Sequence, residues 1–315
     1  MATVAPVPSR FEHRALLYAD DRDYVAGAVP FVLDGLDAGT PVAVAVPGSR
    51  LKLLRTALER SAEAVTWIDL AEVGANPGRI LPEVLLAFAD ANPGPVRIVD
   101  ETVWPGRTDL EYPACAQHEA LVNTAFAGLP AAILCLYDTA GLPREWIAES
   151  AATHPELTAG GRRWGSDRYA PDAVVAGHNG PLAEPGGPVV LDTGFGEDGL
   201  VTTRRAAAAV GGELGLSVDR GADLQLIADE LCTNSVRHGG GRGRLRMWAD
   251  GDLVACEVTD AGTMTDPLAG RVPVPATNPG GRGLLMVHWL ADLVRTRTAP
   301  GDNVVRVYLR RQFAP

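Results

Sequence analysis

Residues 228–241 read ADELCTNSVRHGGG, and the spacing within this stretch is the strongest signal in the sequence. Before and within it, apolar residues recur at three- and four-residue steps, which predicts an amphipathic helix. Glu230, Asn234 and His238 are four residues apart, so their side chains share the neighbouring face of that helix. Taken alone, this pattern is also typical of a solvent-exposed polar stripe.

The three side chains suit the chemistry of a nucleotide site. An ionised Glu230 can take a proton from an attacking hydroxyl or water. Asn234 offers a neutral side-chain oxygen, which suits Mg²⁺ where triphosphate oxygens supply the negative charge. His238 lies at the expected end of the helix, where it can contact a phosphate.

Two glycine-containing motifs follow. In VTDAG, residues 258–262, Asp260 ends an apolar strand and can accept a hydrogen bond from an exocyclic amine such as adenine N6. Gly262 lets the backbone come close behind it. In GGRGLLMV, residues 280–287, the glycines precede a helix whose N-terminal N–H groups can bind phosphate. Each motif alone also fits an ordinary turn or loop.

The composition is that of a globular protein of about two domains. The 315 residues are 46% apolar and 21% charged, and the net charge of -11 argues against attraction to nucleic acid or an anionic membrane. No signal sequence or membrane-spanning run occurs, so we expect a cytoplasmic protein. The four cysteines lack the close pairing typical of metal sites, and we interpret them as buried apolar residues.

Residues 10–157 alternate short apolar runs with longer amphipathic patterns. The runs ALLYA, PVAVAVP, AVTWIDL, PVRIVDETV and AAILCLYD predict buried strands. Alternation of strands and helices predicts an α/β domain with a mainly parallel sheet and helices on both faces. Asp100, Glu101 and Asp138, at strand ends, either line a ligand cleft or simply terminate the strands.

The rest of the chain has a different order of elements. Residues 158–188 are rich in Gly and Pro and predict a linker, in which Trp164 and Tyr169 indicate that part of the segment packs down, either as a strand or without one. Residues 189–315 predict an α+β sandwich with one antiparallel sheet, in which a strand and two helices precede a hairpin that turns at Asp250-Gly251-Asp252. A helix over 281–294 and a strand over 303–312 complete it.

With these motifs in this order, residues 190–312 resemble the GHKL ATP-binding fold of gyrases, histidine kinases and anti-sigma-factor serine kinases. ELCTNSVRHG matches the N box of that family, and VTDAG and GGRGLLMV match its two glycine boxes. The short lid between Asp260 and Gly280 is most similar to the anti-sigma regulatory branch. Many members have a second glycine in the first glycine box, where this chain has Met264, a departure that bears on nucleotide affinity.

The resemblance implies a site for ATP with Mg²⁺. It implies that Glu230 is the catalytic base, that Asn234 is the Mg²⁺ ligand and that Asp260 recognises adenine. The remaining ATP-binding residues that it implies are His238, Gly262, Gly281, Arg282 and Gly283.

Residues 12–157 resemble the MEDS sensory domain through HRALLYADD, NPGRILPE, EALVNTAF, CLYD and THPEL. That fold is thought to be related to the RecA-like ATPases. The GxxxxGK[ST] phosphate loop is absent from the sequence, however, and PGSRLKLL, which occupies its place, predicts a plain strand-to-helix turn.

The two resemblances together imply a cytoplasmic signalling regulator. Its sensory domain would control an ATP-binding anti-sigma factor that captures a sigma factor and phosphorylates a serine on an anti-sigma-factor antagonist. A homodimer is compatible with this, and no direct nucleic-acid or membrane partner is expected.

Two alternatives stay open. One is a non-catalytic, ATP-dependent protein-interaction module. The other is a histidine kinase with His118 as phosphoacceptor, but His118 falls inside the α/β domain, where a structural role is favoured.

Overall fold

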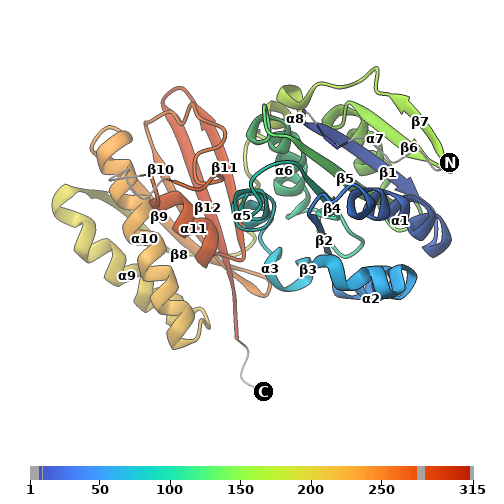
Figure 1. Ribbon diagram of the computed structural model, residues 1–315. Helices are drawn as coiled ribbons and strands as arrows, with labels where there is room; N and C mark the ends of the chain where they lie inside the picture. The colour runs from blue at the N-terminus through green and yellow to red at the C-terminus, as the bar shows by residue number, and fades with distance from the viewer. Residues whose placement is uncertain (1–6, 9, 275–280, 313–315) are drawn as a thin grey trace. The chain divides into compact units, whose positions relative to one another are not determined.

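The protein consists of two compact units, residues 1–178 and 179–315 (Figure 1). The computed structural model describes residues 7–8, 10–274 and 281–312. Each unit buries its own cluster of apolar side chains, so each is described by itself below.

The first unit is built on a seven-stranded sheet in the order β3-β2-β4-β5-β1-β6-β7. All neighbouring strands are parallel except β6 and β7, which form an antiparallel hairpin. This confirms the predicted mainly parallel sheet. The strands are β1 (Glu12–Tyr18), β2 (Val42–Val46), β3 (Val65–Asp69), β4 (Val96–Asp100), β5 (Ala131–Asp138), β6 (Glu156–Ala159) and β7 (Arg162–Gly165).

Helices cover both faces of this sheet. Alternate residues of β5 face opposite ways, so Leu134 and Leu136 join the core under α1 and α2, whereas Cys135 faces α6. The helices are α1 (Asp21–Asp37), α2 (Gly48–Leu58), α3 (Leu70–Val73), α4 (Pro77–Arg79), α5 (Ala87–Ala91), α6 (Tyr112–Ala125), α7 (Arg144–Thr153) and α8 (Pro171–Gly177), with a π-helical turn (Ile80–Leu86) joining α4 to α5.

The segment expected to be a linker, residues 158–188, is largely structured. Its first part supplies the end of β6, all of β7 and α8, and the two units divide between His178 and Asn179. The Gly and Pro residues that suggested a linker instead serve turns, such as the one between β6 and β7, where Gly160 and Gly161 have φ values of 53° and 75°.

The second unit is a five-stranded antiparallel sheet in the order β11-β12-β10-β9-β8, with three helices packed on one face. This confirms the predicted α+β sandwich. Its elements are β8 (Val189–Gly196), α9 (Leu200–Glu213), α10 (Val218–His238), β9 (Arg242–Asp250), β10 (Leu253–Asp260), α11 (Gly283–Leu290), β11 (Leu293–Ala299) and β12 (Asp302–Arg310).

Helix α10 contains Glu230, Asn234 and His238. Ser217 caps it, because its side chain accepts a hydrogen bond from the Arg220 N–H at 3.2 Å. Leu224, Ile227 and Leu231 are buried against the sheet, as the periodicity predicted. Because these apolar side chains fix how the helix is rotated on the sheet, they also fix the direction of its polar face.

Near the C-terminus the predicted helix over 281–294 is too long. Helix α11 ends at Leu290, and Ala291 has extended backbone angles (φ -84°, ψ 148°). Leu293 to Ala299 then form β11, which pairs with β12. Leu293 and Val294 fit either a helix or a strand by sequence. Here they form a strand, because they pair with the edge of β12 that β10 does not occupy.

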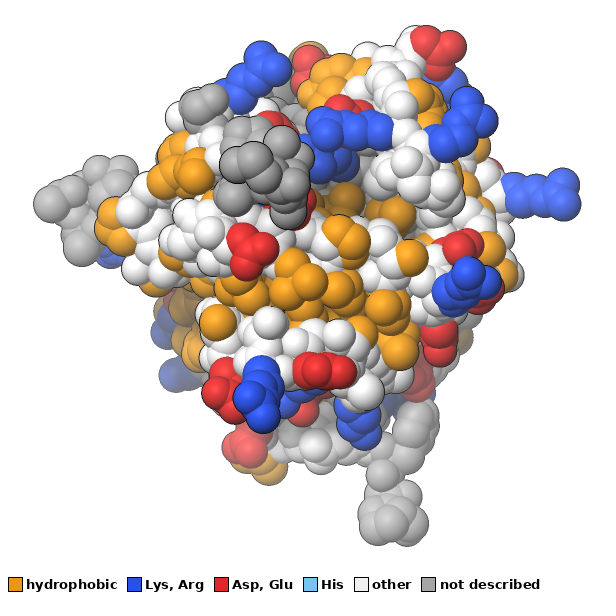
Figure 2. Space-filling model, turned by 45° about the vertical axis from the view of Figure 1, so that its right-hand side comes forward, with side chains coloured by type: hydrophobic (Ala, Val, Ile, Leu, Met, Phe, Trp, Pro, Cys, Tyr) orange, Lys and Arg blue, Asp and Glu red, His pale blue; other side chains and the backbone are white. Residues whose placement is uncertain are grey.

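Charged side chains are mixed on the surface. On the face shown in Figure 2, acidic and basic groups are interspersed, with apolar side chains between them. In the described part of the chain, no helix combines the length and the apolar character needed to cross a lipid bilayer.

Candidate functional site

The start of α11 lies directly against the polar face of α10. Gly283 is so close that a Cβ at this position would collide with Glu230 Oε2 and would lie 3.7 Å from Asn234 Nδ2. Glu230 and Asn234 are both only partly buried, so both are accessible beside this glycine. The fold thus brings together the helix and the glycine loop, which are some fifty residues apart in sequence.

Asp260 is the second fixed point of the site. It ends β10, and its carboxylate accepts hydrogen bonds from Ser235 Oγ (2.6 Å) and from the Gly262 N–H (2.8 Å). Asn303 Nδ2 lies 3.3 and 3.4 Å from the two carboxylate oxygens. A carboxylate has about four lone-pair positions. Asp260 can therefore be held in place and still accept a bond from a ligand.

Gly262 and the end of α10 pack closely together. A Cβ on Gly262 would lie 2.8 Å from the His238 carbonyl oxygen and 2.9 Å from Asp260 Oδ1, so only glycine fits here. The backbone N–H of Ala261 donates to the Gly239 carbonyl at 3.2 Å. The side chain of His238 is exposed at this end of the helix.

The lid joins this corner to the start of α11. Met264 is partly buried, and its N–H donates to Thr298 Oγ1 at 2.9 Å. Further along, Gly270 has a φ of 72° and packs against Leu284 of α11. Gly281 and Arg282 are exposed immediately before that helix, and Gly280 lies outside the described residues.

These residues have the chemistry that ATP with Mg²⁺ requires. A carboxylate and a side-chain amide lie beside a glycine at a helix N-terminus, whose free N–H groups favour phosphate. Because Gly283 has no side chain, the N-terminus of α11 can lie this close to Glu230, where any Cβ would clash. The residues present therefore fit the group that the sequence implied.

Two residues of this site were missed by the sequence analysis. Ser235 is buried on the face of α10 that packs against the sheet, and its hydroxyl positions Asp260. Asn303 follows the β11–β12 turn, far from every motif in the sequence. Only the strand pairing of Asp260 with Asn303 reveals its role.

In the first unit, the strand-end acids make internal bonds. Glu101 accepts hydrogen bonds from Tyr18 (2.6 Å) and Tyr24 (3.1 Å), and burial raises its pKa to about 7. Asp138 lies 3.5 Å from the guanidinium of Arg50, which belongs to the first turn of α2. Asp100 is fully buried and accepts from Thr102 Oγ1 at 2.8 Å.

His118 is not placed as a phosphoacceptor. It is 1% exposed, lies on α6 inside the first unit and sits 3.9 Å from Asp100. The four cysteines are all unpaired and buried, as expected for apolar residues. Cys135 Sγ, however, lies 3.2 Å from Nε2 of His13 on the neighbouring strand. The spacing of the cysteines in the sequence does not indicate this contact.

Comparison with known proteins assigns both units at the level of family. Residues 12–155 match the family described as MEDS, the methanogen/methylotroph DcmR sensory domain. Residues 197–309 match the histidine kinase-like ATPase domain. No curated protein matches the chain.

Two solved structures show low similarity to parts of the chain. The structure of the RsbU and RsbW domains of a Mycobacterium tuberculosis protein is 17% identical, with a TM-score of 0.29, over 40% of this chain and 34% of that one. The Acinetobacter baumannii histidine kinase AdeS is 11% identical, with a TM-score of 0.24, over 39% of this chain and 68% of that one. The chain thus spans about a third of the first of these. By its two family matches, the chain belongs to the MEDS domains over residues 12–155 and to the histidine kinase-like ATPase domains over residues 197–309.

Proposed function

We propose that this protein is a cytoplasmic signalling regulator whose C-terminal domain binds ATP with Mg²⁺ and phosphorylates a serine of an anti-sigma-factor antagonist. The same domain would capture a sigma factor, and the N-terminal MEDS domain would control it. The observation that supports the proposal is the closeness of Gly283 to Glu230 and Asn234, because these are the candidate base, the candidate metal ligand and part of the candidate phosphate loop.

The residues divide the chemical work between them. Asn234 would hold Mg²⁺, which neutralises charge on the phosphates. Glu230 would take the proton of the serine hydroxyl. The serine oxygen would bond to the γ-phosphorus of ATP as the bond between the γ-phosphorus and the β,γ-bridging oxygen breaks and ADP leaves. Phosphoryl transfer depends mostly on positioning and charge, so this small set is sufficient. Phosphoserine carries close to two negative charges, which would release the antagonist from an acidic or apolar interface.

ATP binding is tested by thermal melting of wild type, Asn234→Ala and Asp260→Asn with Mg-ATP and with Mg-GTP. Mg-ATP at 100 times its Kd should stabilise wild type by about 2.7 kcal/mol relative to the ligand-free protein. Mg-GTP at the same concentration should stabilise it less. Asn234→Ala should lose most of this shift, and Asp260→Asn should lose the preference for adenine. Asp219→Asn, an exposed substitution in the first turn of the same helix, is the control. No shift of wild type at millimolar Mg-ATP would exclude the nucleotide site.

The kinase step has its own test, which uses Mg-ATP and candidate antagonists. Glu230→Gln keeps the size of the side chain but removes the base, so transfer to serine should fall by about 10²–10⁴-fold. Its melting shift with Mg-ATP should remain. Clear ATP binding by wild type without phosphoserine on any antagonist would reject the kinase and leave the binding function.

That outcome would favour the second candidate function, a non-catalytic interaction module whose shape depends on ATP. Met264 is the observation in its favour. This residue stands where many relatives have glycine, and its N–H is bonded to Thr298 within the sandwich. The start of the lid is thereby tied to β11, which suits a binding surface as well as a catalytic one.

A further inference from the structure

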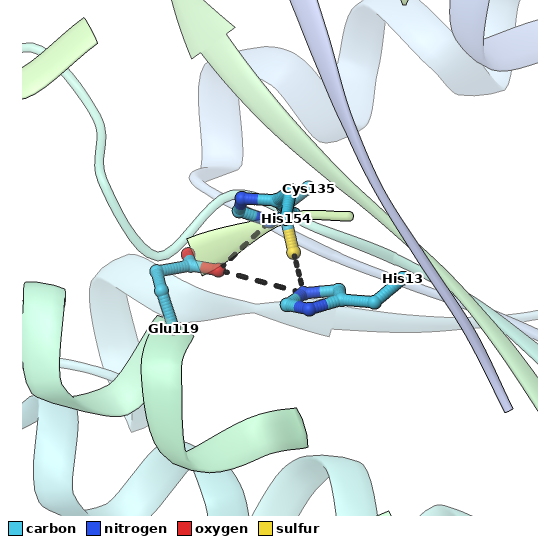
Figure 3. A group of neighbouring side chains, drawn as sticks. All are labelled: His13, Glu119, Cys135 and His154. Carbon is cyan, nitrogen blue, oxygen red and sulfur yellow. Dashed lines mark hydrogen bonds and ion pairs between the residues drawn. The ribbon is translucent and has the colours of Figure 1, made fainter. Parts of the chain in front are cut away.

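Four side chains that can bind a metal ion meet in the interior of the N-terminal domain (Figure 3). His13 comes from β1, Cys135 from β5, Glu119 from α6 and His154 from the end of α7. Each is at most 1% exposed. In the register of β1 and β5, His13 pairs with Ile133, so Cys135, two residues further on, shares its face of the sheet.

The distances between these atoms match a tetrahedral metal site. Zinc bonds of about 2.0–2.3 Å to nitrogen, oxygen and sulfur place neighbouring ligand atoms about 3.3–3.6 Å apart. Here His13 Nε2 lies 3.2 Å from Cys135 Sγ and 3.8 Å from Glu119 Oε2. His154 Nε2 lies 3.4 Å from Glu119 Oε2, and all four ligand atoms lie within 4.8 Å of one another.

Both histidines turn an unprotonated nitrogen toward this centre. Asn123 donates from Nδ2 to three backbone carbonyls, so its Oδ1 must accept the proton on His13 Nδ1, at 3.0 Å. His154 Nδ1 lies 2.9 Å from the Ser150 carbonyl, which can only accept. The proton of each ring is therefore on Nδ1, and each Nε2 presents a lone pair. Metal-binding histidines are usually oriented by such outer bonds.

The centre as it stands lacks a positive partner. Among the described residues, His154 Nε2 has no hydrogen bond, and the oxygens of the buried Glu119 carboxylate have at most a weak one, from the Cys135 thiol. Two acceptors, Glu119 Oε2 and His154 Nε2, instead face each other. Buried carboxylates and imidazole lone pairs are costly to leave unpaired, and a cation between them removes that cost.

We propose that His13, Glu119, Cys135 and His154 bind one divalent metal ion of the zinc class. Two imidazoles, a thiolate and a carboxylate suit Zn²⁺, whereas Mg²⁺ and Ca²⁺ prefer sites built of oxygen alone. Cys135 gives up its thiol proton to solvent as the bond to the metal forms. With four protein ligands the ion ties β1, β5, α6 and α7 together and so stabilises the domain.

Glu119 also connects the centre to a small cavity. Tyr112, Tyr137 and Trp146 supply its aromatic walls, and Ser150 lines it beside the carboxylate.

The test uses the full chain, stripped of metal by a chelator and titrated with Co²⁺. We expect one Co²⁺ per chain, visible d–d bands of a tetrahedral ion, a near-ultraviolet thiolate charge-transfer band and loss of all of these when Zn²⁺ is added. Cys135→Ser should lose the charge-transfer band. Cys115→Ser is the matched control, because Cys115 is a buried thiol of the same domain outside the cluster, and it should keep the band.

A second variant keeps the test decisive if Cys135→Ser does not fold. His154→Gln should bind Co²⁺ at least tenfold more weakly than wild type, and Zn²⁺ should raise the melting temperature of wild type more than that of the variant. Wild type that binds no Co²⁺ or Zn²⁺ would overturn the proposal and leave a protonated Glu119 as the bridge. A charge-transfer band that depends on Cys115 as much as on Cys135 would also overturn it.

Discussion

Asp260 shows how a single side chain is prepared for a ligand. Ser235, Gly262 and Asn303 come from a helix, a loop and a strand, and all contact its carboxylate. None of them carries a charge, so the negative charge is oriented without being neutralised. A ligand amine would meet an acceptor whose position is already fixed, which reduces the entropy lost on binding.

Glu101 allows a prediction about pH. Its pKa is about 7 in the folded protein because the side chain is buried, whereas an ordinary glutamate titrates near about 4.3. Between these values the folded state keeps a proton that the unfolded state releases, so the contribution of Glu101 to stability falls as the pH rises. The free energy of unfolding of Glu101→Gln, minus that of wild type, should therefore be larger at pH 8 than at pH 5. Urea unfolding at the two pH values measures it.

The control for this experiment is Glu63→Gln, at an exposed position of the same domain. The free energy of unfolding of Glu63→Gln should differ from that of wild type by the same amount at pH 5 and at pH 8. If the difference between Glu101→Gln and wild type is also independent of pH, the folded protein does not hold Glu101 in its protonated form.

At the scale of elements, the lid and α11 fit together through one glycine. Gly270 has a left-handed φ of 72°, and a Cβ here would lie 2.6 Å from Leu284 Cβ. Gly301, in the turn between β11 and β12, has a similar φ of 76° but no atom near such a Cβ. The two positions therefore separate the cost of backbone conformation from the cost of a steric clash.

We predict that Gly270→Ala destabilises the C-terminal domain more than Gly301→Ala does. Both substitutions pay about 1–2 kcal/mol for the left-handed backbone, and Gly270→Ala adds about 1–3 kcal/mol for overpacking. Thermal melting of the two variants measures the difference, and the shift with Mg-ATP should be reduced only in Gly270→Ala. Equal losses of stability would mean that the lid does not pack on α11.

At the scale of the whole molecule, the two units have separate clusters of buried apolar side chains. One lies between α1, α2 and the parallel sheet, and the other lies between the helices and the antiparallel sheet of the second unit. Their sizes, 178 and 137 residues, are each sufficient for an independently stable domain.

Calorimetry should accordingly show two unfolding transitions. Mg-ATP should raise the midpoint of one of them much more than that of the other, because a ligand stabilises only the unit that binds it. Isolated fragments 1–178 and 179–315 identify which transition belongs to which unit. A single transition in the full chain would contradict this and would show that the two units unfold as one.

Periodicity and short motifs were enough to predict much of the protein. The parallel and antiparallel sheets, helix α10 and its two faces, and the turn at Gly251 all follow from local sequence. This works because side-chain burial repeats every 2 or about 3.6 residues, and because glycine marks positions of unusual backbone. The roles of Glu230 and Asn234 remain predictions, but their shared face was readable from their spacing.

Tertiary structure alone decided the rest. Residues 291–294 fit either the end of a helix or the start of a strand, and pairing with β12 places Leu293 and Val294 in β11. Likewise Asn303 meets Asp260, and His13 meets Cys135, only through the register of neighbouring strands. Contacts between residues more than forty positions apart leave no periodic trace in a sequence, because they depend on how whole elements pack. The metal-binding cluster of the first domain could therefore be recognised only in the folded chain.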